Sequence, residues 1–97
     1  MNTFRKGDLV GVPCVVQRGP FTDENLVMVE TEEGTISGFA KQANITVGDG
    51  DRGLIKGTVV ATEKDHIVVR LFGSFFTTAL GLASVRPKGL ERLLVAT

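Results

Sequence analysis

Apolar and polar residues alternate along residues 26–39, and this alternation predicts a β-hairpin. Val27 and Val29 are separated by Met28 and followed by Glu30. Because successive side chains of a strand point to opposite faces, the valines are expected to point inward and Glu30 outward. Glu33 and Gly34 form a candidate two-residue loop, since glycine accepts the positive φ of a primed turn. The return strand would then direct Ile36, Gly38 and Ala40 to one face and Thr35, Ser37 and Phe39 to the other.

The same pattern returns 40 residues later, over residues 66–79. Val27, Val29 and Ile36 correspond to Ile67, Val69 and Phe76, and Gly73-Ser74 is the equivalent two-residue loop. Residues 43–45 correspond to residues 83–85, and residues 14–16 correspond to residues 58–60 with an offset of 44. The sequence therefore predicts an internal duplication, with repeats at residues 1–48 and 49–97 that pack as one unit. The alternative is that the two halves are separate β-meanders without a common origin, which look similar because β-meanders in general share this pattern.

The remaining segments are predicted to be short strands and turns. Pro13 interrupts the strand at residues 9–16, and its missing N–H places that strand at an edge or breaks it there. Residues 41–44 favour a short turn or one turn of 3₁₀ helix, followed by a brief strand at residues 45–47. The glycine-rich residues 48–53 mark the join between the repeats. A strand at residues 54–60 restarts the pattern, and residues 90–95 close it.

Two segments of the first repeat resemble known small barrels. Residues 6–10, KGDLV, and residues 39–45, FAKQANI, resemble the opening and closing signatures of Src-homology-3-like and KOW-like barrels, and residues 79–85 resemble the closing signature more loosely. The resemblance implies an all-β fold, built either as two such barrels packed together or as one pseudo-two-fold six-stranded barrel. Lys41 and Gly81 stand where these barrels often have proline. The chain also lacks Trp and Tyr, which disfavours recognition of proline-rich ligands.

The composition of the chain excludes several classes of function but points to none in particular. The chain has 97 residues and 42% hydrophobic residues, which is enough for a packed core. Its formal net charge is zero, so no overall field attracts nucleic acid or membrane. One cysteine, Cys14, and one histidine, His66, offer no disulfide and no metal cluster. We expect no cofactor, no metal and no catalytic residues. The sequence shows no apolar segment like that of a signal peptide and no apolar stretch long enough to span a membrane, so we expect a cytoplasmic protein.

The phenylalanines give the first functional hypothesis, a non-enzymatic protein-interaction or assembly module. Phe75 and Phe76 are adjacent on a predicted strand, so they point to opposite faces, and the correspondence of Phe76 with inward Ile36 leaves Phe75 outside. Phe39 and Phe72 are further candidates for exposed apolar anchors, which mark interfaces. The partner would be another protein or a second copy of the chain. The alternative is that other parts of the protein cover these rings.

Basic residues in the second half give the alternative, a nucleic-acid-binding accessory protein. Arg86, Lys88 and Arg92 lie close in sequence, and Arg70 and Lys56 could join them. The neutral net charge and the lack of Tyr and Trp count against this reading, and a solvated basic face is its ordinary alternative. A hydrolase or lyase is disfavoured further, because no nucleophile–base pair or metal cluster is legible in the sequence.

Overall fold

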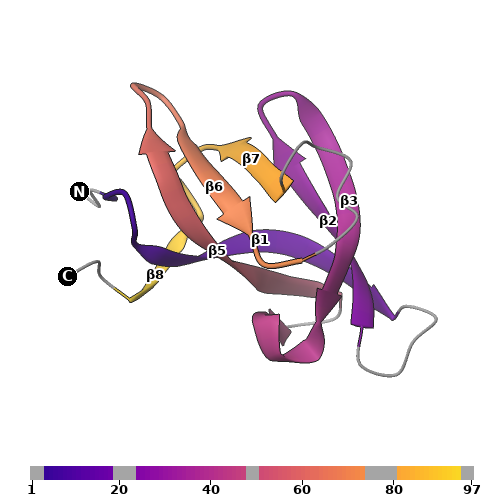
Figure 1. Cartoon of the computed structure of the whole chain (residues 1–97). Helices are drawn as coiled ribbons and strands as arrows, with labels where there is room; N and C mark the ends of the chain where they lie inside the picture. Colours follow the sequence, from indigo (N-terminus) through magenta and orange to yellow (C-terminus); the bar gives the residue numbers. More distant parts are fainter. Residues whose placement is uncertain (1–3, 19–23, 48–50, 74–80, 95–97) are drawn as a thin grey trace.

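The fold is all-β, as the sequence predicts (Figure 1). The computed structural model describes residues 4–18, 24–47, 51–73 and 81–94. Within these ranges no helix is long and apolar enough to cross a membrane. The elements are β1 (Leu9–Arg18), β2 (Glu24–Thr31), β3 (Gly34–Lys41), the 3₁₀ helix η1 (Gln42–Asn44), β4 (Ile45–Val47), β5 (Arg52–Thr62), β6 (Ile67–Leu71), β7 (Leu82–Val85) and β8 (Glu91–Leu94). The predicted 3₁₀ turn and the brief strand after it are confirmed.

All eight strands belong to one antiparallel sheet with the order β3-β2-β1-β5-β6-β7. In addition, β4 pairs with β5 and β8 pairs with β1. This order is symmetric about the central β1–β5 pair, and both halves of the chain contribute to the same sheet. The sequence offset of 40 residues relates β2 to β6 but not β3 to β7, so the duplication itself stays a prediction.

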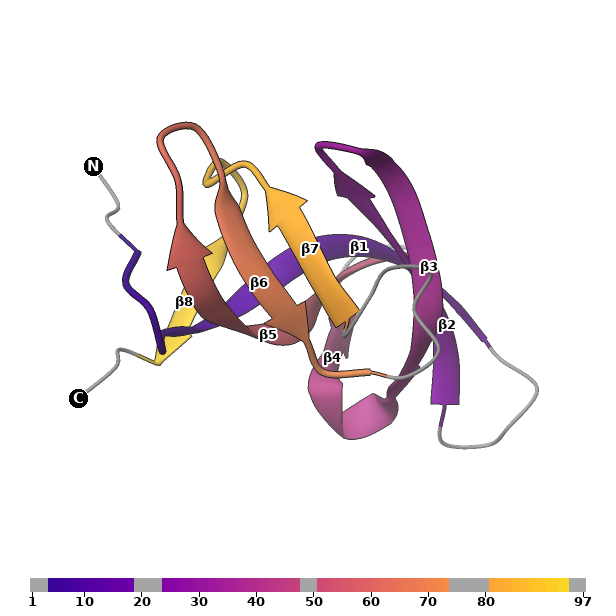
Figure 2. The same ribbon diagram turned by 45° about the horizontal axis from the view of Figure 1, so that its top comes forward.

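The sheet curls into a half-barrel whose concave side holds the core (Figure 2). Val27 and Val29 of β2 are fully buried, as the alternation predicts, and they share the core with Ile55 of β5 and Val69 of β6. The two ends of the sheet, β2–β3 and β7, lie close together. The N–H of Glu32 donates a 2.8 Å hydrogen bond to the carbonyl oxygen of Ser84. This bond joins the β2–β3 turn directly to β7.

The first hairpin forms as predicted, but its turn lies one residue earlier. Thr31 pairs with Gly34, so Glu32 and Glu33 occupy the loop and Gly34 begins β3 with φ at 119°. The hydroxyl of Thr31 donates a 2.6 Å hydrogen bond to the carbonyl oxygen of Gly34 and accepts one of 3.2 Å from the N–H of Glu33. Glycine is therefore required just after the loop rather than inside it.

The second predicted hairpin is wrong in its return strand. A loop at Gly73-Ser74 would place Thr78 opposite Val69, but Val69 pairs with Ala83 instead. The segment at β7 takes this place because Ala83 and Val85 continue the inward phase of β6 and are buried. Residues 75 and 76 lie outside the described residues, so the predicted orientation of the two phenylalanines stays a prediction.

A buried aspartate fastens the start of the chain to the end of the sheet. Asp8 is fully buried, and its Oδ2 accepts a 2.9 Å hydrogen bond from the N–H of Arg5 and lies 3.3 Å from Nε of Arg92 on β8. The guanidinium of Arg92 also lies 5.0 Å from the centre of the Phe4 ring. Because Asp8 is also hydrogen-bonded to Val59 through the backbone, this cluster ties β1, β5 and β8 together.

We predict that Asp8→Asn lowers the free energy of unfolding by about 2–4 kcal/mol, because it leaves the Arg92 charge without its buried partner. Urea unfolding measures this. Asp65→Asn is the matched control, since Asp65 is exposed in the β5–β6 turn and should change stability by less than about 0.5 kcal/mol. Equal losses in the two variants would contradict a stabilising role for the buried pair.

Candidate functional site

One edge of β1 changes its pairing partner at Pro13. Residues 9–11 of β1 pair with β8, and residues 15–18 pair with β2, while β5 covers the opposite edge along residues 9–15. Pro13 lies between the two short ladders and pairs with a strand only on the β5 side. The prediction that this strand lies at an edge or breaks at Pro13 is wrong, because β1 runs unbroken from Leu9 to Arg18 in the centre of the sheet. Pro13 interrupts instead the pairing of β1 with β2 and β8 along one side.

The missing N–H of Pro13 explains why both ladders end there. The N–H of Val16 points toward β5, where it donates a 2.7 Å hydrogen bond to Asp51, so the peptide groups of Val15 and Pro13 point the opposite way. Continuing the register of Val15 with Met28 would place Pro13 opposite Glu30. Proline cannot donate the hydrogen bond that this position requires, and β2 therefore leaves β1 after Met28.

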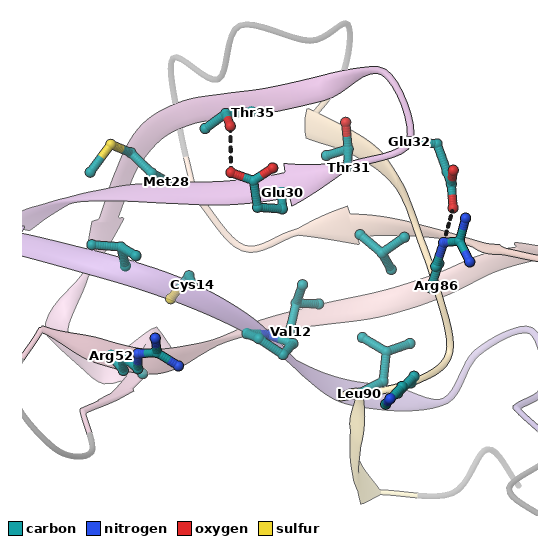
Figure 3. Close-up of a pocket in the computed structure, with 15 residues that line it drawn as sticks. Val12, Cys14, Met28, Glu30, Thr31, Glu32, Thr35, Arg52, Arg86 and Leu90 are labelled. Atoms are coloured by element: carbon teal, nitrogen blue, oxygen red, sulfur yellow. Dashed lines mark hydrogen bonds and ion pairs between the residues drawn. The ribbon is translucent and has the colours of Figure 1, made fainter.

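A groove of about 800 Å³ opens where β1 and β2 diverge (Figure 3). Its floor is apolar and consists of four buried side chains from β1, β7 and the connection before β8: Val12, Cys14, Val85 and Leu90. One wall is β2 with its turn, and the other is the connection from β7 to β8. Met28 and Val15, both half-buried, line the end where β1 and β2 are still paired.

The two walls carry opposite charges. Glu30 and Glu32 lie on the β2 side, and Arg86 and Lys88 lie on the β7–β8 connection. Glu32 Oε1 lies 3.2 Å from Arg86 Nε, and Glu30 accepts a 2.6 Å hydrogen bond from the hydroxyl of Thr35. The Arg86 side chain is 78% exposed, so this ion pair contributes less than about 1 kcal/mol. The acidic wall thus already has partners within the protein.

Arg52 adds a third basic group to the groove. It is exposed at the start of β5, opposite Val15, and it lines the groove beside β1. Among the residues that the structure describes, neither Arg52 nor Lys88 forms an ion pair. Glu30 keeps its charge, because its partner Thr35 is neutral, so the lining carries three cations (Arg52, Arg86 and Lys88) against two anions (Glu30 and Glu32).

Cys14 is buried on the groove floor, as expected for a core residue. Burial raises the pKa of its thiol to about 11, because the thiolate is poorly solvated there. At neutral pH the thiol is protonated and is a weak nucleophile. In the described part of the chain, no group of three His, Cys, Asp or Glu side chains could hold a metal ion.

The structure brings only part of the predicted site together. Arg86 and Lys88 line the groove, whereas Arg70 is exposed on β6, is not among the lining residues, and lies between Thr58 and Leu82 in the sheet. Arg92 forms an ion pair with the buried Asp8 and does not line the groove. The predicted basic cluster is thus divided among different parts of the surface.

The phenylalanines do not line the groove either. Phe39 is half-buried on the outer face of β3 opposite Leu26, and half-buried Phe72 donates its N–H to the carbonyl oxygen of Lys56. Phe75 lies outside the described residues. Sequence reasoning missed Arg52 because its place in the groove depends on the β1–β5 register. Pro13 signalled a missing ladder donor, but the strand itself continues through it.

Comparison with known proteins adds no family to this description. No protein-family model matches the chain, and neither the curated proteins nor the solved structures include a significant match. The resemblance of the two halves to Src-homology-3-like and KOW-like barrels therefore stays a prediction.

We predict that Cys14 reacts slowly with iodoacetamide at pH 7 and that its rate rises with pH up to about pH 11. A thiol pKa of about 11 in place of 9.0 reduces the reactive thiolate about 100-fold relative to the urea-unfolded chain, which is the control. Mass spectrometry at a series of pH values measures the rate. A midpoint below pH 9 in the folded protein would contradict the burial of the thiol.

We also predict that Pro13→Val extends the β1–β2 ladder to the position opposite Glu30, two residue pairs beyond Val15 and Met28, and narrows the groove. The new N–H at position 13 would donate to the carbonyl oxygen of Glu30, which lies next in register. Amide hydrogen exchange measured by NMR should show protection at position 13, with the amide of Val15 as the internal reference in both proteins. Rapid exchange at position 13 would mean that something other than the missing donor holds the strands apart.

Proposed function

We propose that the protein is a non-enzymatic interaction module that binds an extended segment of a partner protein in the groove beside β1. The observation that carries this proposal is the interruption of pairing along β1 at Pro13, directly above an apolar floor. A groove bounded by two strand edges suits an extended chain, because main-chain groups and alternate side chains can both be recognised there.

The size of the break fits a short segment. From Gly11, which pairs with β8, to Val15, which pairs with β2, the strand advances roughly 13 Å, enough for about four residues of extended chain. The carbonyl group of Pro13 faces this space by the alternation of the strand and offers an acceptor. Val15 and Met28, both only half-buried, provide apolar surface for side chains of the segment.

The chemistry of the groove supports binding rather than catalysis. The Cys14 thiol is protonated at neutral pH, and the two glutamates of the wall are exposed and engaged by Thr35 and Arg86. Half-buried Val15 and Met28, by contrast, would lose water on contact with an apolar side chain, which favours association. A partner protein is the proposed occupant, and a second copy of the chain is an outcome that the test can reveal.

The experiment is selection of a random linear peptide library displayed on phage against the whole protein, followed by titration of the enriched synthetic peptides. NMR chemical shifts should move at residues 12–15 and 28–32, which border the groove. Sedimentation of the free protein at the same concentrations shows whether a second copy occupies the groove instead. Enrichment of no peptide, or shifts confined to other strands, would overturn the proposal.

We predict that Met28→Gln weakens binding of such a peptide about tenfold, because it removes apolar contact from the groove. Leu26→Gln is the matched control, since Leu26 is also half-buried on the same face of β2 but does not line the groove. Fluorescence anisotropy measures both affinities. Equal weakening in the two variants would show that the effect comes from β2 as a whole and not from the groove.

A further inference from the structure

We infer that the segment bound in the groove is acidic and that Arg52 and Lys88 recognise its carboxylate side chains. This inference rests on the proposed function and adds the chemical class of the partner. It follows from the charges that line the groove and from the partners those charges already have.

Both acidic side chains of the groove have a partner within the protein, whereas only one of its three basic side chains forms an ion pair with a described residue. Glu30 is hydrogen-bonded to Thr35 at 2.6 Å, and Glu32 is paired with Arg86 at 3.2 Å. Of the three lining cations, this leaves Arg52 and Lys88, which are exposed and form no ion pair within the described ranges. The groove therefore presents a positive balance although the whole chain is neutral.

The two cations lie on different sides of the groove. Arg52 is opposite Val15 on the β5 side of β1, and Lys88 belongs to the connection that ends at Leu90. In Figure 3, Arg52 lies to the left of the floor residue Val12, and Leu90, at the end of the connection that carries Lys88, lies to its right. An extended segment with acidic residues on either side of an apolar residue can meet both cations while its apolar side chain covers the floor.

A peptide fits this charge arrangement better than a nucleic acid does. Nucleic-acid affinity depends on several phosphate contacts, and here Arg86 and Arg92 are paired with Glu32 and Asp8. Arg70 is not among the lining residues, so it is not placed to extend the positive surface of the groove. Two cations that form no ion pair with any described residue, above an apolar floor, match carboxylates on an apolar chain.

The test compares three synthetic nonapeptide libraries that are identical except for two fixed positions flanking a central random triplet, which carry Glu, Gln or Lys. Binding to the whole protein is measured by fluorescence anisotropy at low and physiological salt. We expect the Glu library to bind at least tenfold more tightly than the Lys library, with the difference shrinking as salt screens it. Binding of the Glu library should shift the NMR signals of residues 12–15 and 28–32.

Charge reversal tests the assignment to these residues. Arg52→Glu combined with Lys88→Glu should abolish the preference for the Glu library and favour the Lys library. Arg70→Glu is the matched control, because Arg70 is equally exposed but does not line the groove, and it should leave the preference unchanged. All three substituted side chains are exposed, and circular dichroism checks that the variants remain folded.

The other outcomes separate this inference from the proposed function. Groove-directed binding of the Gln or Lys library with equal or higher affinity would overturn the acidic segment and leave peptide binding standing. Binding of none of the three libraries would overturn both. Displacement of the Glu peptides by an equal concentration of single-stranded oligothymidylate would assign the cations to phosphates and overturn the inference.

Discussion

The missing N–H of Pro13, in the strand β1 that pairs with β2, β5 and β8, constrains the arrangement of the sheet. β1 lies at the centre of the sheet, and one of its edges must serve both β2 and β8. Because Pro13 cannot donate on that edge, neither ladder can pass it, and the two partners stay on opposite sides of it. The loss of one hydrogen-bond donor thus separates two strands that would otherwise converge.

The β2–β3 hairpin, which leaves β1 after Met28, is attached to β7 at the other end of the sheet. Beyond Met28, β2 reaches β7, where the backbone bond from Glu32 to Ser84 closes the half-barrel. This bond fixes the groove wall more firmly than the exposed Glu32–Arg86 pair can, since such pairs contribute little in water. A backbone hydrogen bond therefore holds this wall of the groove, and the segment that we propose as its occupant would require little ordering of the protein on binding.

Local signals in the sequence predicted the local features of this fold well. The alternation around Val27 and Val29 and the 3₁₀ turn each depend on neighbouring residues, and both are confirmed. Pro13 was expected to end or break its strand, but it interrupts the pairing on one side of a strand that stays continuous. The return strand of β6 was not predictable in the same way. Its prediction rested on a tight loop at Gly73-Ser74, whereas β6 pairs with the more distant β7, whose Ala83 and Val85 are buried in the core. Arg52 joins the groove through the long-range β1–β5 register, which no short motif encodes.

The basic residues that looked alike in the sequence have different physical roles once folded. Arg92 lies against buried Asp8, where its charge is needed to offset the desolvation of the carboxylate. Arg86 is engaged across the groove by Glu32, while Arg52 and Lys88 face solvent without an ion-pair partner in the described part of the chain. A charge that stabilises the fold is not free to bind a ligand, because moving it would expose a buried opposite charge. At the groove the cations without such a role are Arg52 and Lys88, and for this reason we propose them as the groups that recognise a partner's charge.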